Sequence, residues 1–364
     1  MEITDISVDG YERVVRARDP ESGLHALIAV HDTTLGPALG GMRMWPYASE
    51  DEALYDVLRL SKGMTFKSAV AHTGLGGGKA VIVGDPKTTK SEALFLAMGR
   101  FVDSLGGKYI TAEDVNIAVP DLEIVRRATK NVTGLELKDG GSGNPSPYTA
   151  YGTFLGLVAA CKWKFGTDDL TGRTVAVQGV GAVGGPLVER LVEAGAVVTV
   201  CDSKADRVQD LVDRLGVTAV AGDAIYDVDA EVFAPCAMGA IINDDTIGRL
   251  KCKVIAGAAN NVLHEERHGR EVEQRGMLYA PDYVINAGGI VNVSVEFKDG
   301  GYDEGHALRC IERIPEALRE VWTLAEAENL PASEAADRLA QNIVAEAKDA
   351  KAAAAPAKDA KQDA

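Results

Sequence analysis

The sequence predicts a two-domain α/β protein, in which an N-terminal α/β domain and a Rossmann-type doubly wound domain are separated by a cleft. The chain of 364 residues is longer than one ordinary core fills, so two domains are expected. Its first part alternates strand and helix patterns, and its second part continues with strand, glycine turn, helix and strand. We therefore divide the chain into residues 1–143, residues 144–330 and a C-terminal segment, residues 331–364.

In the first domain, short apolar runs predict strands and capping signals predict helices. Residues 25–32 form an apolar run rich enough in Ile and Val to be a buried strand. Ser49 is a candidate N-cap and Glu52 follows three residues later, a capping box that predicts a helix over residues 49–71. The remaining expected elements are a strand at 79–86, a helix over 89–105 and a strand at 108–114 that ends on acidic residues.

The second domain follows residues 134–152, whose Gly, Ser, Asn and Pro content predicts a loop and a crossing between the domains. Beyond the glycine turn, further short strands are expected within residues 231–236, 253–259 and 277–289. Residues 307–330 have a strong helical pattern, and we expect the chain to cross back to the first domain near there. The Ala/Lys/Asp tail, residues 348–364, is expected to follow a C-terminal helix and to be disordered.

The composition favours a cytosolic protein that acts on small molecules. A net charge of −16 argues against nucleic-acid or anionic-membrane binding, because both surfaces repel an acidic protein. No uncharged apolar run approaches the roughly 18 residues of a membrane span, and we expect no signal peptide at the N-terminus. The five cysteines contain no Cys-x-x-Cys pair, which fits reduced thiols better than a disulfide frame or a zinc site.

A dinucleotide site is predicted where Gly-x-Gly-x-x-Gly follows a β-branched strand and opens a helix. The three glycines allow a tight turn, close approach of a pyrophosphate, and close packing of helix on strand. The free N–H groups at the start of the helix would bind the phosphates. The residues expected to contact the cofactor here are Gly179, Val180, Gly181, Ala182, Val183 and Gly184.

The strand that follows this helix ends at Asp202, whose carboxylate can accept hydrogen bonds from the adenine-ribose hydroxyls. This acid favours NAD over NADP. Lys204 and Arg207 come just after it and could tolerate a 2′-phosphate, so the use of NADP stays open. The alternative is a glycine turn that binds nothing, but strand, helix and acid in register make dinucleotide binding the stronger interpretation.

A second glycine-rich stretch, GLGGGKAVIV at residues 74–83, does not meet the requirements of a phosphate-binding P-loop. Thr73 stands where the first glycine of that motif belongs, and Ala80 replaces the hydroxyl residue that binds Mg²⁺. The stretch also precedes a strand, whereas a P-loop follows one. We expect instead that these glycines let substrate and nicotinamide come close to Lys79.

Two other residues can work with Lys79. Lys67 lies shortly before it in the chain, and Asp114 ends the strand at 108–114. Two ammonium groups beside one pocket lower each other's pKa and attract a carboxylate, and a nearby aspartate can serve as a base. Each residue also has a plain interpretation, as a solvated lysine or a helix-capping aspartate, so these residues alone leave the catalytic interpretation open.

No metal site is expected. His264 and His268 could share a helical face, but the stretch HEERHG lacks the HExxH order and a nearby third ligand. We expect both histidines to lie on the surface.

Six stretches cover roughly residues 20–300 in order: PALGGMRMWPYASEDEALYDVLRLSKGMTFKSAVAHTGLGGGKAVIVGDP, YITAEDV, SGNPSPYTAYG, VAVQGVGAVG, EVFAPCAMGAIIN and APDYVINAGGIVNV. Together they resemble the Glu/Leu/Phe/Val family of amino-acid dehydrogenases, and most closely its branched-chain members. The resemblance implies reversible oxidative deamination, in which an L-amino acid, NAD⁺ and water give a 2-oxo acid, ammonium and NADH. It also implies that Lys67 binds the substrate carboxylate, that Lys79 activates water and polarises the developing carbonyl, and that Asp114 carries protons.

The same resemblance implies the remaining contacts and a homo-oligomer assembled through the first domain. The implied substrate-binding residues, apolar apart from the lysine, are Leu39, Gly40, Gly41, Met64, Lys67, Ala112, Ile290 and Val293. Such a lining suits leucine, valine or isoleucine, although Ile290 and Val293 could equally be helix core. Thr149, Asn261 and Asn286 would lie near the nicotinamide ribose.

Several alternatives remain to be weighed. Departures from the family pattern at Met42, Asn116 and Asn260 leave the preferred side chain open, so a family member that prefers phenylalanine is a rival. A 2-hydroxy-acid dehydrogenase would need a His–carboxylate base and an arginine for the substrate carboxylate, and no such pairing stands beside the glycine turn. A regulator that binds NAD without turnover would not need Lys79.

Overall fold

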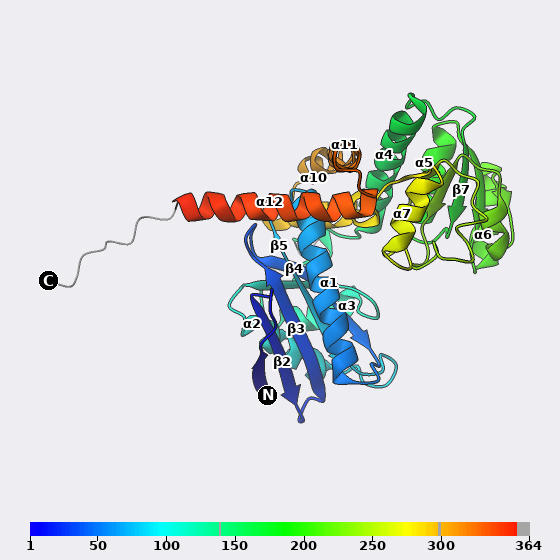
Figure 1. Cartoon of the computed structure of the whole chain (residues 1–364). Coiled ribbons are helices and arrows are strands. Elements are labelled where there is room, and N and C mark those ends of the chain that lie inside the picture. Colours follow the sequence, from blue (N-terminus) through cyan, green and yellow to red (C-terminus); the bar gives the residue numbers. More distant parts are fainter. Residues whose placement is uncertain (138–139, 298–299, 355–364) are drawn as a thin grey trace.

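Two six-stranded sheets organise the computed structural model, which describes residues 1–137, 140–297 and 300–354 (Figure 1). The first sheet comes from the N-terminal part of the chain and the second from residues 174–279. Helices pack on both sheets, so the two-domain α/β architecture predicted from the sequence is confirmed. The predicted domain limits at residues 143 and 330 stay predictions.

The first sheet has the order β1-β2-β3-β5-β4-β6. Its members are β1 (Glu2–Ile6), β2 (Arg13–Asp19), β3 (Leu24–Asp32), β4 (Ala38–Trp45), β5 (Gly76–Val83) and β6 (Tyr109–Glu113). The pairs from β1 to β5 are antiparallel, whereas β5, β4 and β6 run parallel, so the carboxyl ends of these three strands meet at one edge. All three strands expected in this domain are confirmed, with β5 lying three residues earlier than expected.

Helices cover both faces of this sheet because its central strands are apolar on both sides. On one face α1 (Glu50–Val70) packs against Leu27 and Val81, and on the other α2 (Glu92–Asp103) packs against Ile28 and Ile82. This alternation follows from the pleat, and it turns Lys79, which has the parity of Val81, toward α1. The short helix α3 (Val119–Arg126) packs beside α2.

The predicted cap of α1 is confirmed. Ser49 Oγ accepts a hydrogen bond from the backbone N–H of Glu52 at 3.1 Å. The reciprocal bond of a capping box is displaced by one residue, because the Glu52 carboxylate accepts from the backbone N–H of Ala48 at 2.8 Å. The entry to α1 is thereby fixed, and with it the position of the lysine near the other end of the helix.

The second sheet is parallel throughout and has the order β12-β11-β10-β7-β8-β9. Counted from β7 as the first strand, this is the doubly wound order 3-2-1-4-5-6 of dinucleotide-binding folds. The strand order reverses between β7 and β10, and ligands of such sheets bind outside the strand ends at that point. The strands are β7 (Thr174–Gln178), β8 (Val197–Cys201), β9 (Thr218–Ala219), β10 (Val232–Pro235), β11 (Val254–Ile255) and β12 (Leu278–Tyr279).

Helices flank this second sheet and connect it to the first domain. Those that follow its strands are α5 (Gly184–Glu193), α6 (Ala205–Leu215), η2 (Gly222–Asp227) and α7 (Arg267–Gln274). The prediction of a loop over 134–152 is wrong from Ser146 onward, because α4 (Ser146–Phe165) begins there. Pro147 in the first turn is compatible with this start, since the N–H it lacks has no partner inside a helix. Residues 277–289 are strand only at β12 and continue as α8 (Asp282–Ile285), α9 (Gly288–Ser294) and η3 (Val295–Phe297).

The C-terminal helices carry the chain back to the first domain, as expected. Residues 307–330 fall into two helices, α10 (Glu304–Ile311) and α11 (Ile314–Glu328). The last helix, α12 (Ala332–Ala354), packs on α7 and α11 and crosses α1 (Figure 1). Its Lys348 Nζ lies 2.8 Å from Oδ2 of Asp32, the last residue of β3. The disorder expected for residues 348–364 is wrong for 348–354, which belong to α12, and residues 355–364 lie outside the described residues.

Candidate active site

Three parallel strands bring Arg43, Lys79 and Asp114 to one point in the first domain. Arg43 lies on β4, Lys79 on β5, and Asp114 directly after β6. Arg43 Nε lies 2.8 Å, and Lys79 Nζ 3.1 Å, from the same carboxylate oxygen, Asp114 Oδ2. Within the described residues, Asp114 Oδ1 accepts no hydrogen bond. Lys79 and Asp114, which the sequence could place together only by inference, therefore lie in direct contact.

Burial and neighbouring charges set the protonation of this pair. Burial lowers the pKa of Lys79, which is only 5 % exposed, and Arg43 acts in the same direction while Asp114 opposes them. Burial would raise the pKa of Asp114, but Lys79 and Arg43 outweigh it and hold that pKa below its usual value. An ionised carboxylate beside an ammonium whose pKa is lowered is an arrangement suited to moving protons.

Lys67 on α1 faces the second domain. Its Nζ lies 2.6 Å from Oδ1 of Asn286, the residue that follows α8. Burial lowers the pKa of Lys67 to about 8, against the opposing charge of Asp282 and with a further lowering from the nearby Lys79. The two lysines therefore influence each other, as expected, and a carboxylate arriving here would meet two ammonium groups.

Side-chain hydrogen bonds join the two domains near Lys67. In addition to the Lys67–Asn286 bond, Arg59 Nη1 on α1 lies 3.4 Å from Oδ1 of Asn261 in the second domain. Where the sequence predicts a cleft, side chains of the two domains are thus in direct contact.

The glycines before Lys79 pack against protein. A Cβ on Gly77 would lie 2.0 Å from the backbone nitrogen of Thr65 on α1, and one on Gly78 would lie 2.7 Å from an aromatic ring of β6. The expectation that these glycines open a path for substrate is wrong for both positions. Gly77 allows α1 to lie directly on β5, which brings Lys67 near Lys79. Gly78 leaves room for the ring of Tyr109.

The glycines of β4 have a similar role. A Cβ on Gly40 would lie 1.7 Å from the carbonyl oxygen of Gly78, and one on Gly41 would lie 2.8 Å from the Cβ of Asp114. Gly41 is also paired with Ala112 across β4 and β6. Close strand packing beside Asp114 therefore needs glycine at both positions, and direct substrate contact by Gly40 and Gly41 stays a prediction.

The apolar residues assigned to substrate gather at the domain boundary. Leu39 of β4 and Met64 of α1 belong to the same apolar cluster as Ile290 and Val293 of α9. Ile290 and Val293 are each 8 % exposed, and Ala112 is half-buried on the neighbouring strand. The structure thus brings together side chains from both domains, and their contact with a substrate side chain stays a prediction.

The glycine turn after β7 has the shape of a phosphate cradle. Gly179 has φ +91° and an added Cβ would lie 2.5 Å from the Cβ of Ala237, so only glycine fits there. A Cβ on Gly184 would lie 1.9 Å from the carbonyl oxygen of Gly179. By contrast, a Cβ on Gly181 would meet only the end of Arg207, at 3.3 Å. The outer glycines close the turn, while the middle one faces space that a pyrophosphate can enter.

The other residues of this turn are also compatible with a bound pyrophosphate. Val180 is buried, Ala182 continues the turn, and Val183 precedes α5, whose N-terminus has no side-chain cap. Asp202 follows β8, and its Oδ2 accepts a hydrogen bond from the backbone N–H of Val180 at 2.8 Å. Burial would raise the pKa of Asp202, but backbone N–H donors, with Arg207, hold it below its usual value, so the acid is ionised.

The residues expected near the nicotinamide ribose lie where the two domains meet. Asn286 is 3 % exposed and its Nδ2 donates to Asn260 Oδ1 at 2.7 Å, a contact that an aspartate at position 260 would also accept. Asn261 has φ +50° and contacts the first domain through Arg59. Thr149, on the first turns of α4, packs against Gly289 of α9.

Sequence reasoning missed Arg43, Asp56 and Arg59. Arg43 sits in the stretch GGMRM, two residues after Gly41, and the parity of β4 was the signal that could have placed it beside Asp114. One of the departures from the family pattern also finds a cause here: Asn116 has φ +62°, a conformation that glycine adopts freely and asparagine tolerates.

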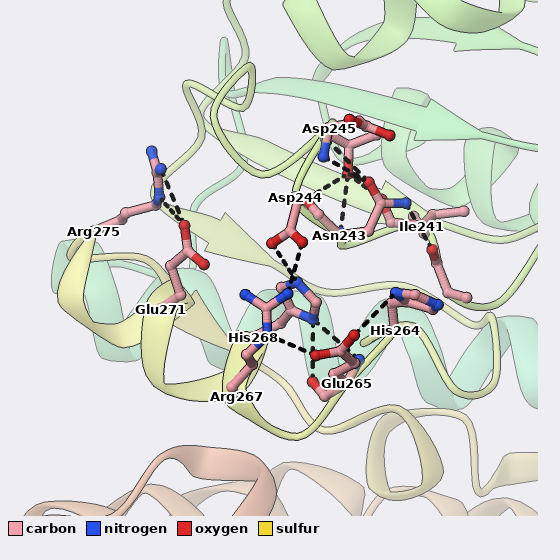
Figure 2. Close-up of polar contacts among 12 residues, drawn as sticks. Ile241, Asn243, Asp244, Asp245, His264, Glu265, Arg267, His268, Glu271 and Arg275 are labelled. Carbon is pink, nitrogen blue, oxygen red and sulfur yellow. Dashed lines mark hydrogen bonds and ion pairs between the residues drawn. The ribbon is translucent and has the colours of Figure 1, made fainter.

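The prediction that both HEERHG histidines lie on the surface is wrong for His268. His264 is exposed, but His268 is fully buried and its Nδ1 accepts a hydrogen bond from the backbone N–H of Glu265 at 3.0 Å (Figure 2). The imidazole thus gives the backbone N–H of Glu265, just before α7, a hydrogen-bond partner. The sequence carries no signal that this histidine is buried.

Two potential ligands lie near His268, against expectation, although His264 is not part of the group. Ligand atoms of Asp244, His268 and Glu271 lie within 4.8 Å of one another. Both carboxylates already have cationic partners, since Asp244 pairs with Arg267 at 2.7 Å and Glu271 with Arg275 at 3.1 Å (Figure 2). These ion pairs account for the cluster without a metal.

Family comparisons cover nearly all of the described chain. Residues 11–131 match the model of the Glu/Leu/Phe/Val dehydrogenase dimerisation domain, and residues 140–208 and 204–352 match that of glutamate/leucine/phenylalanine/valine dehydrogenase. No helix among the described residues is long and apolar enough to cross a membrane.

Individual relatives agree with the family models. Leucine dehydrogenase of Thermoactinomyces intermedius is 53 % identical over 92 % of this chain and 91 % of its own, and phenylalanine dehydrogenase of Bacillus thermotolerans is 46 % identical over 92 % and 88 %. The crystal structure of L-tryptophan dehydrogenase from Nostoc punctiforme superposes with a TM-score of 0.84 at 41 % identity, covering 93 % of this chain and 97 % of that one. The fold, the cluster of Arg43, Lys79 and Asp114 and these matches lead to one conclusion: the chain belongs to the Glu/Leu/Phe/Val dehydrogenase family and is an amino-acid dehydrogenase.

Proposed function

We propose that this enzyme catalyses the NAD-dependent, reversible oxidative deamination of a branched-chain L-amino acid. The amino acid, water and NAD⁺ give the 2-oxo acid, ammonium, NADH and a proton. One observation carries the proposal: Lys79 Nζ lies 3.1 Å from Asp114 Oδ2 in a largely buried site that Lys67 also faces. The relatives named leucine dehydrogenase, at about half identity over most of the chain, support the same reaction.

The residues of the second domain fit a dinucleotide. Gly181 leaves space beside the uncapped start of α5 for a pyrophosphate, and the ionised Asp202 suits the hydroxyls of an adenine ribose. Thr149, Asn261 and Asn286 would hold the nicotinamide end. When bound, the nicotinamide supplies a hydride acceptor for the substrate Cα.

In the proposed reaction, Lys67 binds the substrate carboxylate. The ammonium is held in place by Asn286 Oδ1 at 2.6 Å, and it is partly buried, so an ion pair with the substrate is screened by water less than at the surface. A carboxylate anchored beside α1 fixes the Cα and its amino group relative to Asp114. This positioning favours the reaction by removing the freedom of the reacting groups.

Lys79 and Asp114 would divide the proton transfers. Lys79 donates a hydrogen bond to the oxygen of the water that adds to the substrate iminium, and its lowered pKa lets it exchange a proton with that oxygen. Asp114 accepts a proton through Oδ1, the oxygen that accepts no hydrogen bond among the described residues, and returns it to the departing ammonia. Lys79 is buried and Asp114 is only partly exposed, which strengthens their interactions with the charged intermediates.

The apolar cluster at the domain boundary supports a branched aliphatic side chain as the preferred substrate. Leu39, Met64, Ile290 and Val293 add no charge and no polar side-chain group to that boundary, so a second substrate carboxylate would be left unpaired. Phenylalanine is the competing substrate, because relatives of that specificity are 46 % identical.

A screen for NADH production across the L-amino acids, with NAD⁺ and NADP⁺, tests the proposal. We expect leucine, valine and isoleucine with NAD⁺ to give the highest kcat/KM, and ammonium-dependent NADH oxidation with the matching 2-oxo acids. A higher kcat/KM for L-phenylalanine would make the enzyme a phenylalanine dehydrogenase. Turnover of 2-hydroxy acids, or binding of NAD without turnover of any amino acid, would overturn the proposal.

We also propose that the enzyme is a cytosolic homo-oligomer. The family model matched by the first domain is described as a dimerisation domain, which supports assembly through that part of the chain. The cysteines are all free thiols, which supports a reducing compartment. Light scattering of the purified protein would give the mass of the assembly.

A further inference from the structure

A series of charged groups extends from Asp114 through Arg43. Arg43, which donates to Asp114 through Nε, also lies 2.9 Å from Asp56 Oδ2 through Nη1. Tyr47 Oη donates to the same Asp56 oxygen at 2.7 Å. One guanidinium therefore spans two carboxylates, and its planar fork fixes their relative orientation.

The same series of contacts reaches the second domain. Asp56 Oδ1 lies 3.2 Å from Arg59 Nη2, and Arg59 Nη1 lies 3.4 Å from Asn261 Oδ1. Asp56 and Arg59 are both on α1, whereas Asn261 belongs to the second domain, in the region assigned to the nicotinamide. The contact between Arg59 and Asn261 exists only while the two domains are together.

Charge balance alone does not account for Arg43. Lys79 already provides Asp114 with a cation at 3.1 Å, so a second cation is not required to neutralise that carboxylate. The side chains of Arg43 and Asp114 are 21 % and 24 % exposed, and that of Asp56 is 15 % exposed. Holding three such groups out of water is costly, which favours a role in specifying geometry.

The geometry defines which oxygen of Asp114 is available. Arg43 and Lys79 both bind Oδ2 and thereby restrict rotation of the carboxylate, which leaves Oδ1 as the oxygen free for a proton. We propose that Arg43 is a positioning residue for Asp114, and that Asp56 and Arg59 link this positioning to Asn261, so that Oδ1 is aligned when the domains are together. This inference rests on the proposed function, because it assumes that Asp114 transfers protons.

Removing the charge of Arg43 should raise the pKa of both Asp114 and Lys79. Arg43 favours the charged form of Asp114 and disfavours that of Lys79, so without it the pKa of each group rises. If Arg43 had only a structural role, its removal would lower activity without raising the pKa of both Asp114 and Lys79. The other titratable groups whose charges act on this pair are Tyr47, Asp56, Lys67, Tyr109 and Glu113, and none of them is altered.

The test compares Arg43→Gln and Arg43→Lys with the wild type in oxidative deamination of L-leucine, with kcat and kcat/KM measured across pH. For Arg43→Gln we expect about a hundredfold lower kcat and a pH profile displaced upward by about one pH unit. Arg43→Lys retains the charge without the fork, so kcat should fall about tenfold while the profile keeps the wild-type position. Arg16→Gln is the matched control, since it removes a similarly part-buried ion pair with Glu50 elsewhere in the domain.

A second variant tests the link across the domains. Arg59→Gln should lower kcat about threefold to tenfold, with the pH profile unmoved, because Asp114 and Arg43 keep their contact. If Arg43→Gln does not fold, as judged by circular dichroism, Asp56→Asn decides instead. A kcat at least about tenfold below the wild type would support the positioning role.

The outcomes separate this inference from the proposed function. An unmoved pH profile in Arg43→Gln, whatever its kcat, or wild-type kcat in a required Asp56→Asn test, would overturn the role of Arg43. Wild-type kcat in Arg59→Gln would overturn the link to Asn261. Absence of deamination by the wild-type enzyme on any amino acid would instead overturn the proposed function, before any variant is compared.

Discussion

Carboxylate binding should weaken above neutral pH as Lys67 loses its charge. Burial lowers the pKa of this lysine to about 8. A group whose pKa is lowered in the folded protein is still charged below that value and becomes neutral as the pH rises through it. The proposed substrate anchor is therefore an ammonium at pH 7 and largely an uncharged amine at pH 9.

The magnitude follows from the titration. With a pKa of about 8, about nine-tenths of Lys67 is charged at pH 7 and about one-tenth at pH 9. A ligand that binds only the charged form should thus lose about tenfold in affinity between these values, or about 1.4 kcal/mol. The loss continues at about tenfold per pH unit until the bound lysine itself titrates.

The assay should use a ligand that does not titrate in this range. The compound 4-methylpentanoate keeps a branched side chain and a carboxylate but has no amino group, and its carboxyl stays ionised above about pH 6. Its Kd is measured by calorimetry between pH 7 and 9.5 on enzyme saturated with NADH. Lys67→Arg, whose guanidinium stays charged, should give a Kd that is flat with pH.

Two results would refute this reasoning. A wild-type Kd that does not change between pH 7 and 9.5 would show that the charge of Lys67 does not bind the carboxylate. A rise of Kd with pH that persists unchanged in Lys67→Arg would assign the titration to another group, of which Lys79 is the nearest candidate.

Three further changes have defined outcomes. Lys79→Ala should lower turnover by about a thousandfold while leaving NAD⁺ binding nearly intact, as shown by stopped-flow and fluorescence titration; wild-type turnover would contradict the mechanism. Asp202→Ser should lower the ratio of kcat/KM for NAD⁺ over NADP⁺ by about tenfold, because a charge that repels the 2′-phosphate is removed. Gly40→Ala should destabilise the protein by about 3 kcal/mol in thermal denaturation, since its Cβ would lie 1.7 Å from the carbonyl of Gly78. Gly63→Ala is its control, because nothing lies within 4 Å there and stability should hold or rise.

The sequence predicted those parts of the fold that depend on local signals. The cap at Ser49, the apolar run of β3 and the glycine turn at Gly179 each involve residues close together in the chain, and each is found as expected. The helices that replace a predicted loop after Ser146 and strand beyond Tyr279 have weak local signals, because packing against other helices stabilises them.

The candidate site was predicted less completely, because its arrangement depends on the pairing of distant strands. Lys79 and Asp114 were identified from their motifs, but Arg43 contacts Asp114 only because β4 pairs in parallel with β6 at a particular register. The purpose of the glycines was misjudged for a similar reason. That Gly77 lies against the backbone of α1 is a fact of tertiary packing, and glycine-rich sequence alone does not distinguish it from an open ligand site.

The two cations on Asp114 Oδ2 have different chemistry, and the difference explains why one is arginine and the other lysine. A guanidinium stays protonated at any working pH, so Arg43 can hold Asp114 through every step without competing for a proton. Burial lowers the pKa of Lys79, so this group can exchange a proton with the substrate oxygen. Exchanging the two residue types would place a permanent charge where a proton must move, and a titrating group where a fixed contact is needed. The double exchange Arg43→Lys with Lys79→Arg preserves the net charge, and we expect it to be inactive for that reason.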